Sequence, residues 1–537
     1  MNLRYPDLVS VFSHNGRNDF STEQGSADDV RFEMSMLGST IRLTLTAGST
    51  PMRFLRLRWH FTDDEKRRTP VRVFGDAWER GGGDLEWRGI VPERGMPWFT
   101  LVSNGSDSEP DVSGRSTDCF GVKTQPGAFC FWQYDTAGVT MWADVRNGGS
   151  GVILNGRTLK VCDIVFETYE NCTAFEAGKR FCRRMCDAPL LPKEPVYGAN
   201  NWYYAYGISS AEDILRDSSI ISELCESHSV RPFMVIDDGW SQNSKNGPWD
   251  RGNERFPDMA ALADGIKQRG AKPGIWVRYI YDEGGVCDLP ASWHLERDGD
   301  YLDPSRPEVL DYIRKTTQRF VNWGYQLIKY DCSMQDILGR RGYRVPYVVA
   351  EDGWHFADQS RTSAEIMTDF YRAVREAAGE DTILIGCSTV THLCAGLVHL
   401  ARTGADISGI SWDVTRQRGV NTVAFRMMHH RMMFESDADC IGITEQVPWY
   451  YNRQWLKLLA VSNTPLFVSC KPGILNEEQL KELGAALRRN LERNGDELIP
   501  IDWMENMCPE RWLLNGEEIR FDWYDDKVNP SFHGVSI

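Results

Sequence analysis

The chain has 537 residues, too many for a single hydrophobic core, so two or three domains are expected. Apolar residues make up 42% and aromatic residues 11%, which is typical of a globular protein and not of a disordered one. The formal net charge of −16 argues against nucleic acid or an anionic membrane as a partner, because both would be repelled. A neutral or cationic small molecule is the better expectation.

The first residues contain no basic segment followed by an apolar core, and no later run reaches the length of a membrane span. This favours a cytoplasmic location, with an exported protein that has lost its leader as the open alternative. Among the fourteen cysteines, the close pair Cys182 and Cys186 has no second pair or histidines to complete a zinc site. We expect reduced thiols, no metal and no cofactor, and the sequence leaves a homo-oligomer open.

Residues 1–190 are predicted to form an antiparallel β-sandwich. Apolar and polar residues alternate with period two in Ile41–Leu45 and Leu55–Phe61, which indicates strands with one buried face. Clusters of glycine, asparagine and aspartate separate such segments at hairpin spacing. The tryptophan-rich segment 75–87 either reaches a neighbouring sugar site or fills the interface between domains, and the second interpretation is favoured. A helix over 173–186 would lead out of the sandwich.

Residues 191–492 are predicted to form a (β/α)8 barrel. Capping boxes at Ser209 to Glu212 and Ser305 to Glu308 open two of the helical patterns that separate the predicted strands. A doubly wound sheet is the alternative, but no glycine-rich dinucleotide motif follows the first strand. Residues 493–537 are predicted to be a short C-terminal β segment. The eight predicted strands are 196–204, 233–238, 272–279, 326–331, 382–387, 400–406, 439–443 and 465–470.

Polar side chains stand at the ends of these predicted strands. In a barrel the carboxyl ends of the strands meet at one mouth, where active sites lie. Several carboxylates without a metal motif predict recognition of sugar hydroxyls together with an acid and a nucleophile. Asp439 reaches the mouth only if its strand begins a few residues earlier than predicted. The residues concerned are Asp237 and Asp238 after the second strand, Arg278 after the third, Asp331 after the fourth, Cys387 and Ser388 after the fifth, and Asp406 after the sixth.

Asp331 ends a buried apolar run, with Lys329 on the same face two residues earlier. A buried carboxylate must be paired or must sit at the open end of its strand, since burial without a partner costs several kcal/mol. The position suits a nucleophile. A carboxylate that caps the following loop is the alternative interpretation.

Three short blocks in this order resemble the α-galactosidase superfamily, glycoside hydrolase clan D, families 27 and 36. They are Phe233–Trp240, Leu327–Asp331 and Arg402–Asp406, and the later run Trp449–Ser469 is also similar. The resemblance covers the predicted barrel. It implies a retaining glycosidase that cleaves a terminal α-linked galactose, or a similar sugar, through a covalent glycosyl-enzyme.

Carried onto this sequence, the resemblance makes Asp331 the nucleophile and Asp406 the acid and base. Lys329 and Arg402 would supply cations beside them. A retaining enzyme needs one ionised and one protonated carboxyl group, about 5 to 5.5 Å apart. Asp237 and Asp238 would accept hydrogen bonds from the galactose 4- and 6-hydroxyls.

Other positions carry two interpretations each. Trp202 and Trp276 would either stack on the sugar or pack within the protein, and Asp439 would either contact the sugar or support its neighbours. Cys387-Ser388 replaces the Cys-Glu of several family 27 enzymes, so a 2-acetamido group could be admitted, although some family 36 enzymes also have Cys-Ser.

Arg278 stands where family 36 usually has an acidic residue. It would either bind a different aglycone or, as is favoured, pair with a nearby carboxylate.

Four other functions are alternatives to this one. An α-N-acetylgalactosaminidase or a transglycosylase of the same clan would use the same two acids. A non-catalytic sugar-binding protein would have lost one of them. A Ser-His-Asp hydrolase would need a Gly-x-Ser-x-Gly motif, which the predicted barrel lacks. The prediction is therefore a hydrolase that takes a small or oligosaccharide substrate.

Overall fold

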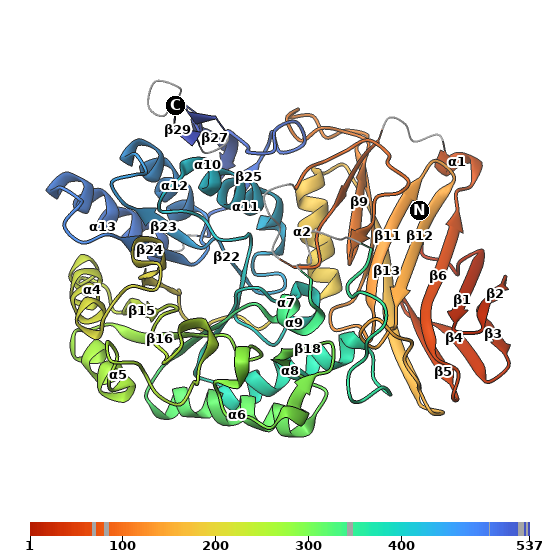
Figure 1. The fold of residues 1–537 in the computed structure, drawn as a ribbon. Helices are drawn as coiled ribbons and strands as arrows, with labels where there is room; N and C mark the ends of the chain where they lie inside the picture. Colours follow the sequence, from red (N-terminus) through yellow and green to blue (C-terminus); the bar gives the residue numbers. More distant parts are fainter. Residues whose placement is uncertain are drawn as a thin grey trace.

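A β-sandwich and a curled parallel sheet surrounded by helices lie side by side in the computed structural model of the chain (Figure 1). The sandwich is red to orange in the figure and the curled sheet is yellow to blue. The structure describes residues 1–66, 71–79, 85–340, 347–492, 495–524, 531–532 and 535–536.

The sandwich consists of two antiparallel sheets, as the alternating segments predict. In β5, Ile41, Leu43 and Leu45 are buried while the residues between them are partly exposed. One sheet has the order β2 (Gly16–Phe20), β1 (Leu8–Ser13), β6 (Met52–His60), β12 (Gly138–Asp144), β11 (Phe129–Asp135), β8 (Met96–Pro97). The other has the order β3 (Gln24–Ala27), β4 (Val30–Leu37), β5 (Thr40–Ala47), β13 (Thr158–Glu170), β10 (Ser116–Val122), β9 (Phe99–Ser103), β7 (Arg72–Gly75). The short helix α1 (Asp63–Lys66) follows β6.

Helix α2 (Ala174–Met185) follows the sandwich and lies between it and the curled sheet (Figure 1). The Thr173 hydroxyl accepts a hydrogen bond from the Glu176 N–H and so caps the helix. Its apolar stripe, which includes Phe181 and Met185, is buried. The helix predicted over 173–186 is confirmed.

The curled sheet contains nine parallel strand segments. Their order is β22 (Glu435–Asp437), β21 (Leu400–Arg402), β20 (Ile383–Gly386), β19 (Leu327–Tyr330), β16 (Lys272–Val277), β15 (Phe233–Ile236), β14 (Tyr197–Asn200), β24 (Leu466–Cys470), β23 (Cys440–Ile443).

The two ends of this order, β22 and β23, are consecutive in the chain and only Ala438 and Asp439 separate them. They are two halves of the seventh strand of a (β/α)8 barrel: β22 pairs with β21, and β23 pairs with β24. The strand predicted to begin at Asp439 therefore begins at Glu435. Asp439 has a φ of 72° and interrupts the strand, which is why an apolar pattern is visible only after it.

The helices cover the outside of the barrel, but two of them begin differently from the prediction. Ser210 and Asp213 form the capping box of α4, because the Ser209 hydroxyl accepts from the Asn201 side chain. Helix α6 begins at Pro307 without a side-chain cap, because the Ser305 hydroxyl accepts from the Asp358 N–H. The helices are α3 (Trp202–Ala205), α4 (Ala211–Leu224), α5 (Met259–Gln268), α6 (Pro307–Asn322), α7 (Ser333–Leu338), α8 (Ser363–Ala378), α9 (Thr391–Cys394), α10 (Trp412–Thr415), α11 (Asn421–Arg426), α12 (Trp449–Val461) and α13 (Glu477–Glu492).

The C-terminal segment forms a three-stranded antiparallel sheet with the strands β25 (Leu498–Pro500), β26 (Arg511–Leu514) and β27 (Glu517–Arg520). The Trp503 indole donates to Asp107 of the sandwich, and the Trp412 indole of the barrel donates to the Trp523 carbonyl. The segment is thus attached to both larger parts. The two-residue strands β28 (Ser531–Phe532) and β29 (Val535–Ser536) follow.

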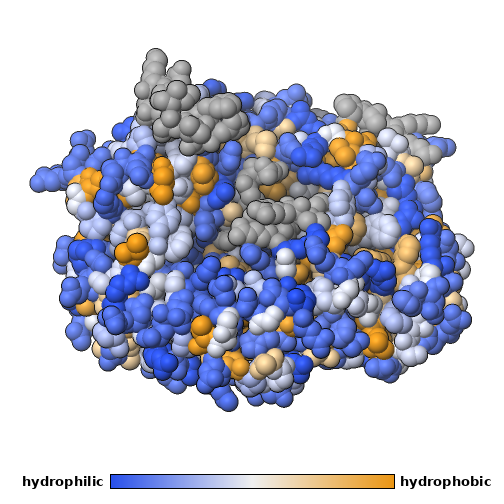
Figure 2. Space-filling view, viewed as in Figure 1, coloured by the Kyte–Doolittle hydropathy of each residue, from blue (hydrophilic) through white to orange (hydrophobic). Residues whose placement is uncertain are grey.

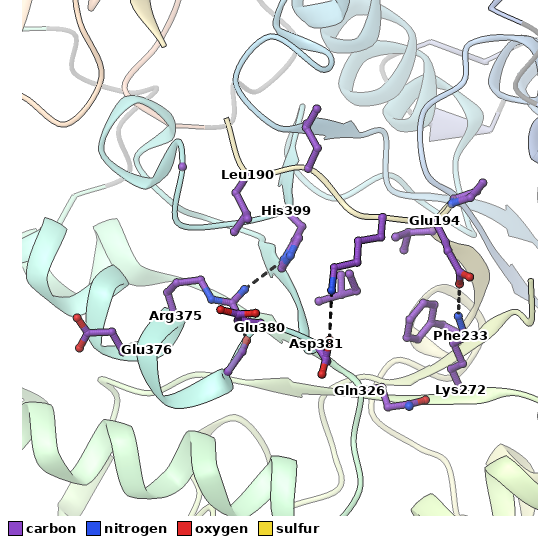
Figure 3. A pocket seen from close by; sticks show the side chains of 17 residues that line it. Leu190, Glu194, Phe233, Lys272, Gln326, Arg375, Glu376, Glu380, Asp381 and His399 are labelled. Carbon is purple, nitrogen blue, oxygen red and sulfur yellow. Dashed lines mark hydrogen bonds and ion pairs between the residues drawn. The ribbon is translucent and has the colours of Figure 1, made fainter. Parts of the chain in front are cut away.

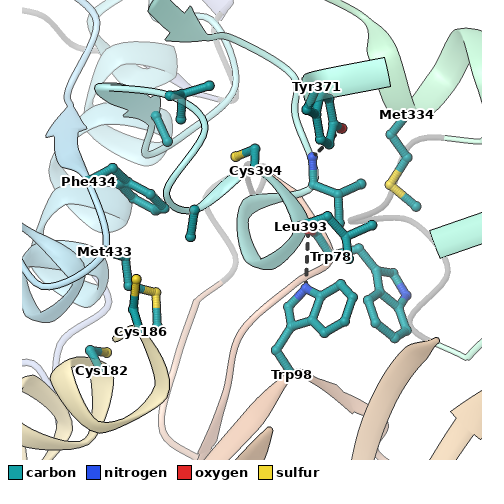
Figure 4. Close-up of a cluster of buried hydrophobic side chains, with 14 of the residues drawn as sticks. Trp78, Trp98, Cys182, Cys186, Met334, Tyr371, Leu393, Cys394, Met433 and Phe434 are labelled. Atoms are coloured by element: carbon teal, nitrogen blue, oxygen red, sulfur yellow. Dashed lines mark hydrogen bonds between the residues drawn. The ribbon is translucent and has the colours of Figure 1, made fainter. Parts of the chain in front are cut away.

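Large apolar side chains fill the interface between the sandwich and the barrel (Figure 4). Trp98 of the sandwich stacks on His392 of the barrel, with ring centroids 5.0 Å apart. Trp78 is fully buried against Trp98, which agrees with the favoured interpretation of the tryptophan-rich segment; residues 80–84 of that segment lie outside the described ranges. Buried Arg426 of the barrel also pairs with Asp76 of the sandwich.

The face of the molecule drawn in Figure 2 is mostly hydrophilic, with hydrophobic residues in small groups. Among the helices that the structure describes, none combines the length and the apolar character needed to cross a membrane. All fourteen cysteines lie in the described ranges as free thiols, and ten of them are buried.

Candidate active site

Asp331 stands directly after β19, where three neighbouring groups orient its carboxylate. One oxygen, Oδ1, accepts hydrogen bonds from the Cys332 N–H (2.7 Å) and the Ser388 hydroxyl. The other oxygen, Oδ2, accepts from the Trp276 indole (3.3 Å). The Cys332 contact is the loop-capping role that the sequence allowed, but Trp276 comes from β16 and Ser388 from the segment after β20, the two strands beside β19. The carboxylate is therefore held by the barrel as well as by its own loop.

Asp406 stands after β21 with 41% of its side chain exposed. The guanidinium of Arg402, the last residue of that strand, lies 3.5 Å from its carboxylate. Arg402 itself is buried and also forms an ion pair with Asp439. Asp406 is thus an accessible carboxylate beside a buried cation.

A short series of contacts joins the two acids. The Arg402 guanidinium donates to the Cys387 sulfur at 3.3 Å, and the next residue, Ser388, donates to Asp331. Both belong to the segment after β20, which lies between β19 and β21 in the sheet. Since neighbouring strands are about 4.8 Å apart, the strands that carry Asp331 and Asp406 are separated by about 10 Å.

Asp237, at the end of β15, forms a buried ion pair with Lys329. The lysine and the Asn200 amide each donate to Asp237 Oδ2 at 2.7 Å, and the Asp238 N–H donates to Oδ1 at 2.9 Å. Burial alone would lower the pKa of Lys329, but the Asp237 carboxylate outweighs it and raises that pKa. Lys329 therefore neutralises Asp237, whereas the family resemblance predicts a cation beside the catalytic acids.

Asp238 is the more accessible member of the aspartate pair. Its carboxylate accepts from the Ser244 hydroxyl at 2.9 Å. Burial raises its pKa, and the Ser244 hydrogen bond opposes that shift. Binding of sugar hydroxyls by Asp237 and Asp238 stays a prediction, and Asp238 has the better access.

Asp439 is buried among protein donors. The Tyr203 hydroxyl, the Arg402 guanidinium and the Ile407 N–H all donate to its Oδ2 atom. Burial raises the pKa of Asp439, while Arg402 opposes the shift. These contacts favour the supporting role over direct sugar contact.

Arg278 forms a two-pronged ion pair with fully buried Asp336 of α7, at 2.8 and 2.6 Å. Its guanidinium also lies 3.9 Å from the ring centre of Tyr281. Pairing with a carboxylate was the favoured interpretation. Arg278 thereby attaches the helix that follows Asp331 to the end of β16.

The two candidate tryptophans differ in their surroundings. Trp276 is buried, and besides donating to Asp331 it accepts at its carbonyl from the Trp240 indole. Trp202 is half-buried, with its ring 5.6 Å from that of Tyr206. Trp276 positions the nucleophile candidate, and Trp202 presents part of its ring to solvent.

Asn200, the last residue of β14, and Asn201 and Tyr203 after it also hold the site together but were not among the predicted site residues. The Asn200 side-chain amide donates to Asp237, the Asn201 side-chain oxygen Oδ1 accepts from the Asp237 N–H at 2.8 Å, and the Tyr203 hydroxyl donates to Asp439. The signal was present, because two consecutive asparagines end the first strand just as two aspartates end the second.

A pocket of about 720 Å³ opens at the other end of the barrel (Figure 3). Its lining includes the first residues of three strands, Phe233, Lys272 and Ile383, together with His399 and with Glu194, which lies between α2 and β14. The candidate acids stand at the opposite strand ends, so this pocket is not part of the candidate site. The described side chains include no group of three or more histidines, cysteines or carboxylates suited to a metal ion.

No family model matches the sequence. The structure is similar to that of an α-galactosidase from Thermus thermophilus in complex with p-nitrophenyl α-D-galactopyranoside, with a TM-score of 0.60 and 18% identity over 93% of this chain and 98% of the other. It is also similar to a GH36 α-galactosidase from Geobacillus stearothermophilus in complex with 1-deoxygalactonojirimycin (TM-score 0.61, 12% identity, 95% and 79% coverage). A third similar structure is the galactosidase domain of an α-galactosidase-sucrose kinase (TM-score 0.61, 14% identity, 95% and 79% coverage). The chain therefore has the fold of these α-galactosidases, a β-sandwich joined to a (β/α)8 barrel.

Proposed function

We propose that the protein is a retaining glycoside hydrolase that removes a terminal α-linked galactose, or a galactose-like sugar, with Asp331 as nucleophile and Asp406 as acid and base. The observation that carries the proposal is the series of contacts from Asp331 through Ser388 and Cys387 to Arg402 and Asp406. It joins two carboxylates that lie beyond the carboxyl ends of two strands, with one strand between those two. The shared fold of the α-galactosidases supports the same assignment.

In the first step the Asp331 carboxylate attacks the anomeric carbon, while the bond from that carbon to the glycosidic oxygen breaks. Asp406 gives its proton to the leaving oxygen. In the second step Asp406 takes a proton from water, the water oxygen attacks the anomeric carbon, and Asp331 leaves. Two displacements at the same carbon retain its configuration.

The surrounding contacts fit these two roles. Ser388, Trp276 and the Cys332 N–H donate to Asp331, which favours an ionised and oriented carboxylate. The ion pair between Arg402 and Asp439 directs much of the arginine's charge away from Asp406, whose proton the first step needs. The same arginine stabilises the Asp406 carboxylate once that proton has left.

The test is a screen of p-nitrophenyl α-galactoside, α-N-acetylgalactosaminide and β-L-arabinopyranoside, with Asp331→Ala protein as the control. We expect the first substrate to be cleaved and the α-anomer of galactose to appear first in the NMR spectrum. Cleavage of none of the three sugars would refute the substrate class. Equal activity of the alanine protein would refute the nucleophile.

Two alternatives use the same acids and give different results. Preference for the acetamido sugar would identify an α-N-acetylgalactosaminidase, and transfer to an added acceptor sugar in place of water would identify a transglycosylase. Oligosaccharide substrates are supported by the Thermus enzyme, whose structure was also solved with stachyose. The domain boundaries, the cytoplasmic location and a homo-oligomer stay predictions.

A further inference from the structure

Three large apolar side chains, on the loops that follow α3 and Asp406, are exposed to solvent: Tyr206 at 39%, Ile208 at 82% and Ile410 at 54%. We call these three residues the apolar rim. Single exposed apolar residues are common on protein surfaces, but a group of them beside a site marks a binding surface. The surroundings of the apolar rim indicate which ligand covers it.

The two loops that carry the rim are fixed to each other. The Tyr206 hydroxyl accepts from the Gly409 N–H at 3.2 Å. A Cβ atom on Gly409 would lie 2.0 Å from the Tyr203 carbonyl oxygen, so only glycine allows this close approach. The Gly409 carbonyl in turn accepts from Thr444. Ile410, next to Gly409, is therefore held on the same side of the barrel mouth as the loop that carries Ile208.

The backbone of Tyr206 is strained. It has a φ of 45° and a ψ of 48°, a left-handed conformation that bulky residues rarely adopt. Strain of this kind persists where the surrounding structure imposes it, and it is frequent at functional sites. Here it leaves the tyrosine ring partly exposed, 5.6 Å from the ring of Trp202.

The rim adjoins the proposed acid. Ile410 lies four residues after Asp406 in the same loop, and the Ile407 N–H between them donates to Asp439 at 3.1 Å. Tyr203, whose hydroxyl donates to the same Asp439 oxygen, has its ring 6.4 Å from that of Tyr206. Since Asp406 gives its proton to the leaving oxygen, the group attached to that oxygen must lie beside Asp406.

We infer that the apolar rim is the binding surface for the leaving group, and that the natural substrates are α-galactosides whose leaving group is apolar, such as an alkyl or acyl-bearing chain. The inference rests on the proposed function. The side chains of Ile208 and Ile410 offer no hydrogen bonds. The hydroxyls of a sugar bound against them would therefore lose their solvation without compensation. A hydrocarbon chain bound there would instead remove apolar area of both the ligand and the rim side chains from water.

The experiment compares octyl and methyl α-D-galactopyranoside, with the octyl compound kept below its critical micelle concentration. The two leaving groups are chemically similar alcohols, so their kcat/KM ratio reports contacts beyond the first carbon. Each methylene group buried in the transition state raises kcat/KM about fourfold. Contact with two of them predicts a preference of about fifteenfold for the octyl compound.

The variant is Ile208→Asn combined with Ile410→Asn, and the matched control is Ile220→Asn, an isoleucine that is 39% exposed on α4. We expect the double variant to lower the octyl-to-methyl ratio by at least about fivefold with little change for the methyl compound. The control should leave the ratio unchanged.

Three outcomes would overturn the inference. The first is an unchanged ratio in the double variant, and the second is an equal loss for both substrates. The third is a change of oligomeric state with an unchanged ratio, which would identify the rim as a contact between copies of the chain. Failure of the wild-type protein to cleave any α-galactoside is a separate result, because it refutes the proposed function itself.

Discussion

Replacing Lys329 by methionine tests whether the Lys329–Asp237 pair mainly holds the barrel together. Asp237 is buried, and its three donors are Lys329, Asn200 and the Asp238 N–H. Methionine has a similar length to lysine and removes only the positive charge and its hydrogen bond. The Asp237 carboxylate would then remain buried with two neutral donors.

The expected loss in the free energy of unfolding follows from these contacts. Removing one partner of a buried ion pair typically costs about 3 to 5 kcal/mol. Because Asn200 and the Asp238 N–H still donate to Asp237, we expect the lower end, about 3 kcal/mol. That corresponds to a folding equilibrium constant lowered by a factor of about 150. The Asp237→Asn, Lys329→Met double variant leaves neither charge of this pair buried and should recover about 2 kcal/mol of the loss.

The assay is urea unfolding followed by tryptophan fluorescence, with kcat/KM for p-nitrophenyl α-galactoside measured on each variant. If Asp237 only stabilises the barrel and does not contact the substrate, the double variant regains activity together with stability. If Asp237 accepts a sugar hydroxyl, the double variant is stable but inactive. A loss below about 1 kcal/mol in Lys329→Met, or a double variant no more stable than the single one, would refute the reasoning.

Three further predictions concern other contacts. Arg426→Met leaves Asp76 buried without its cation between the sandwich and the barrel, so the free energy of unfolding should fall by about 3 to 5 kcal/mol in urea denaturation. Burial lowers the pKa of His392 to about 4, so the folded protein keeps this ring neutral. The unfolded chain, in which the histidine pKa is 6.5, takes up a proton at a higher pH than the folded protein does. The free energy of unfolding therefore does not depend on His392 above pH 6.5, and it falls by up to about 1.4 kcal/mol per pH unit as the pH falls towards 4. His392→Gln should remove this part of the dependence of the unfolding free energy on pH. Ser388→Ala removes a donor to the Asp331 carboxylate, so kcat for an α-galactoside should fall about tenfold with an unchanged fold.

Each of these predictions has a contradicting result. Arg426→Met would contradict the first by unfolding at the wild-type urea concentration. An unchanged pH slope in His392→Gln would show that the histidine does not supply the acid sensitivity. Wild-type kcat in Ser388→Ala would mean that the Cys332 N–H and Trp276 orient Asp331 without the serine.

Most of the fold could be predicted because its signals are local. Alternation with period two in Ile41–Leu45 and the apolar run before Asp331 depend only on which face of a strand is buried. The same logic located Asp331 and Asp406, because a carboxylate that follows a buried strand must lie at its open end. The capping boxes were displaced because residues outside the capping motif donate to the two hydroxyls: Asn201, eight residues before Ser209, and Asp358, 53 residues after Ser305.

The sequence by itself determined the succession of strands and helices and the placing of polar side chains at the strand ends, since both follow from short-range periodicity. The tertiary structure decided the pairing: Lys329 with Asp237, Arg278 with Asp336, and Arg402 with Asp439. It also divided the seventh strand at Asp439. The physical reason is that a buried charge takes its partner from whichever strand the closed barrel brings beside it, and that neighbour is not encoded in local spacing.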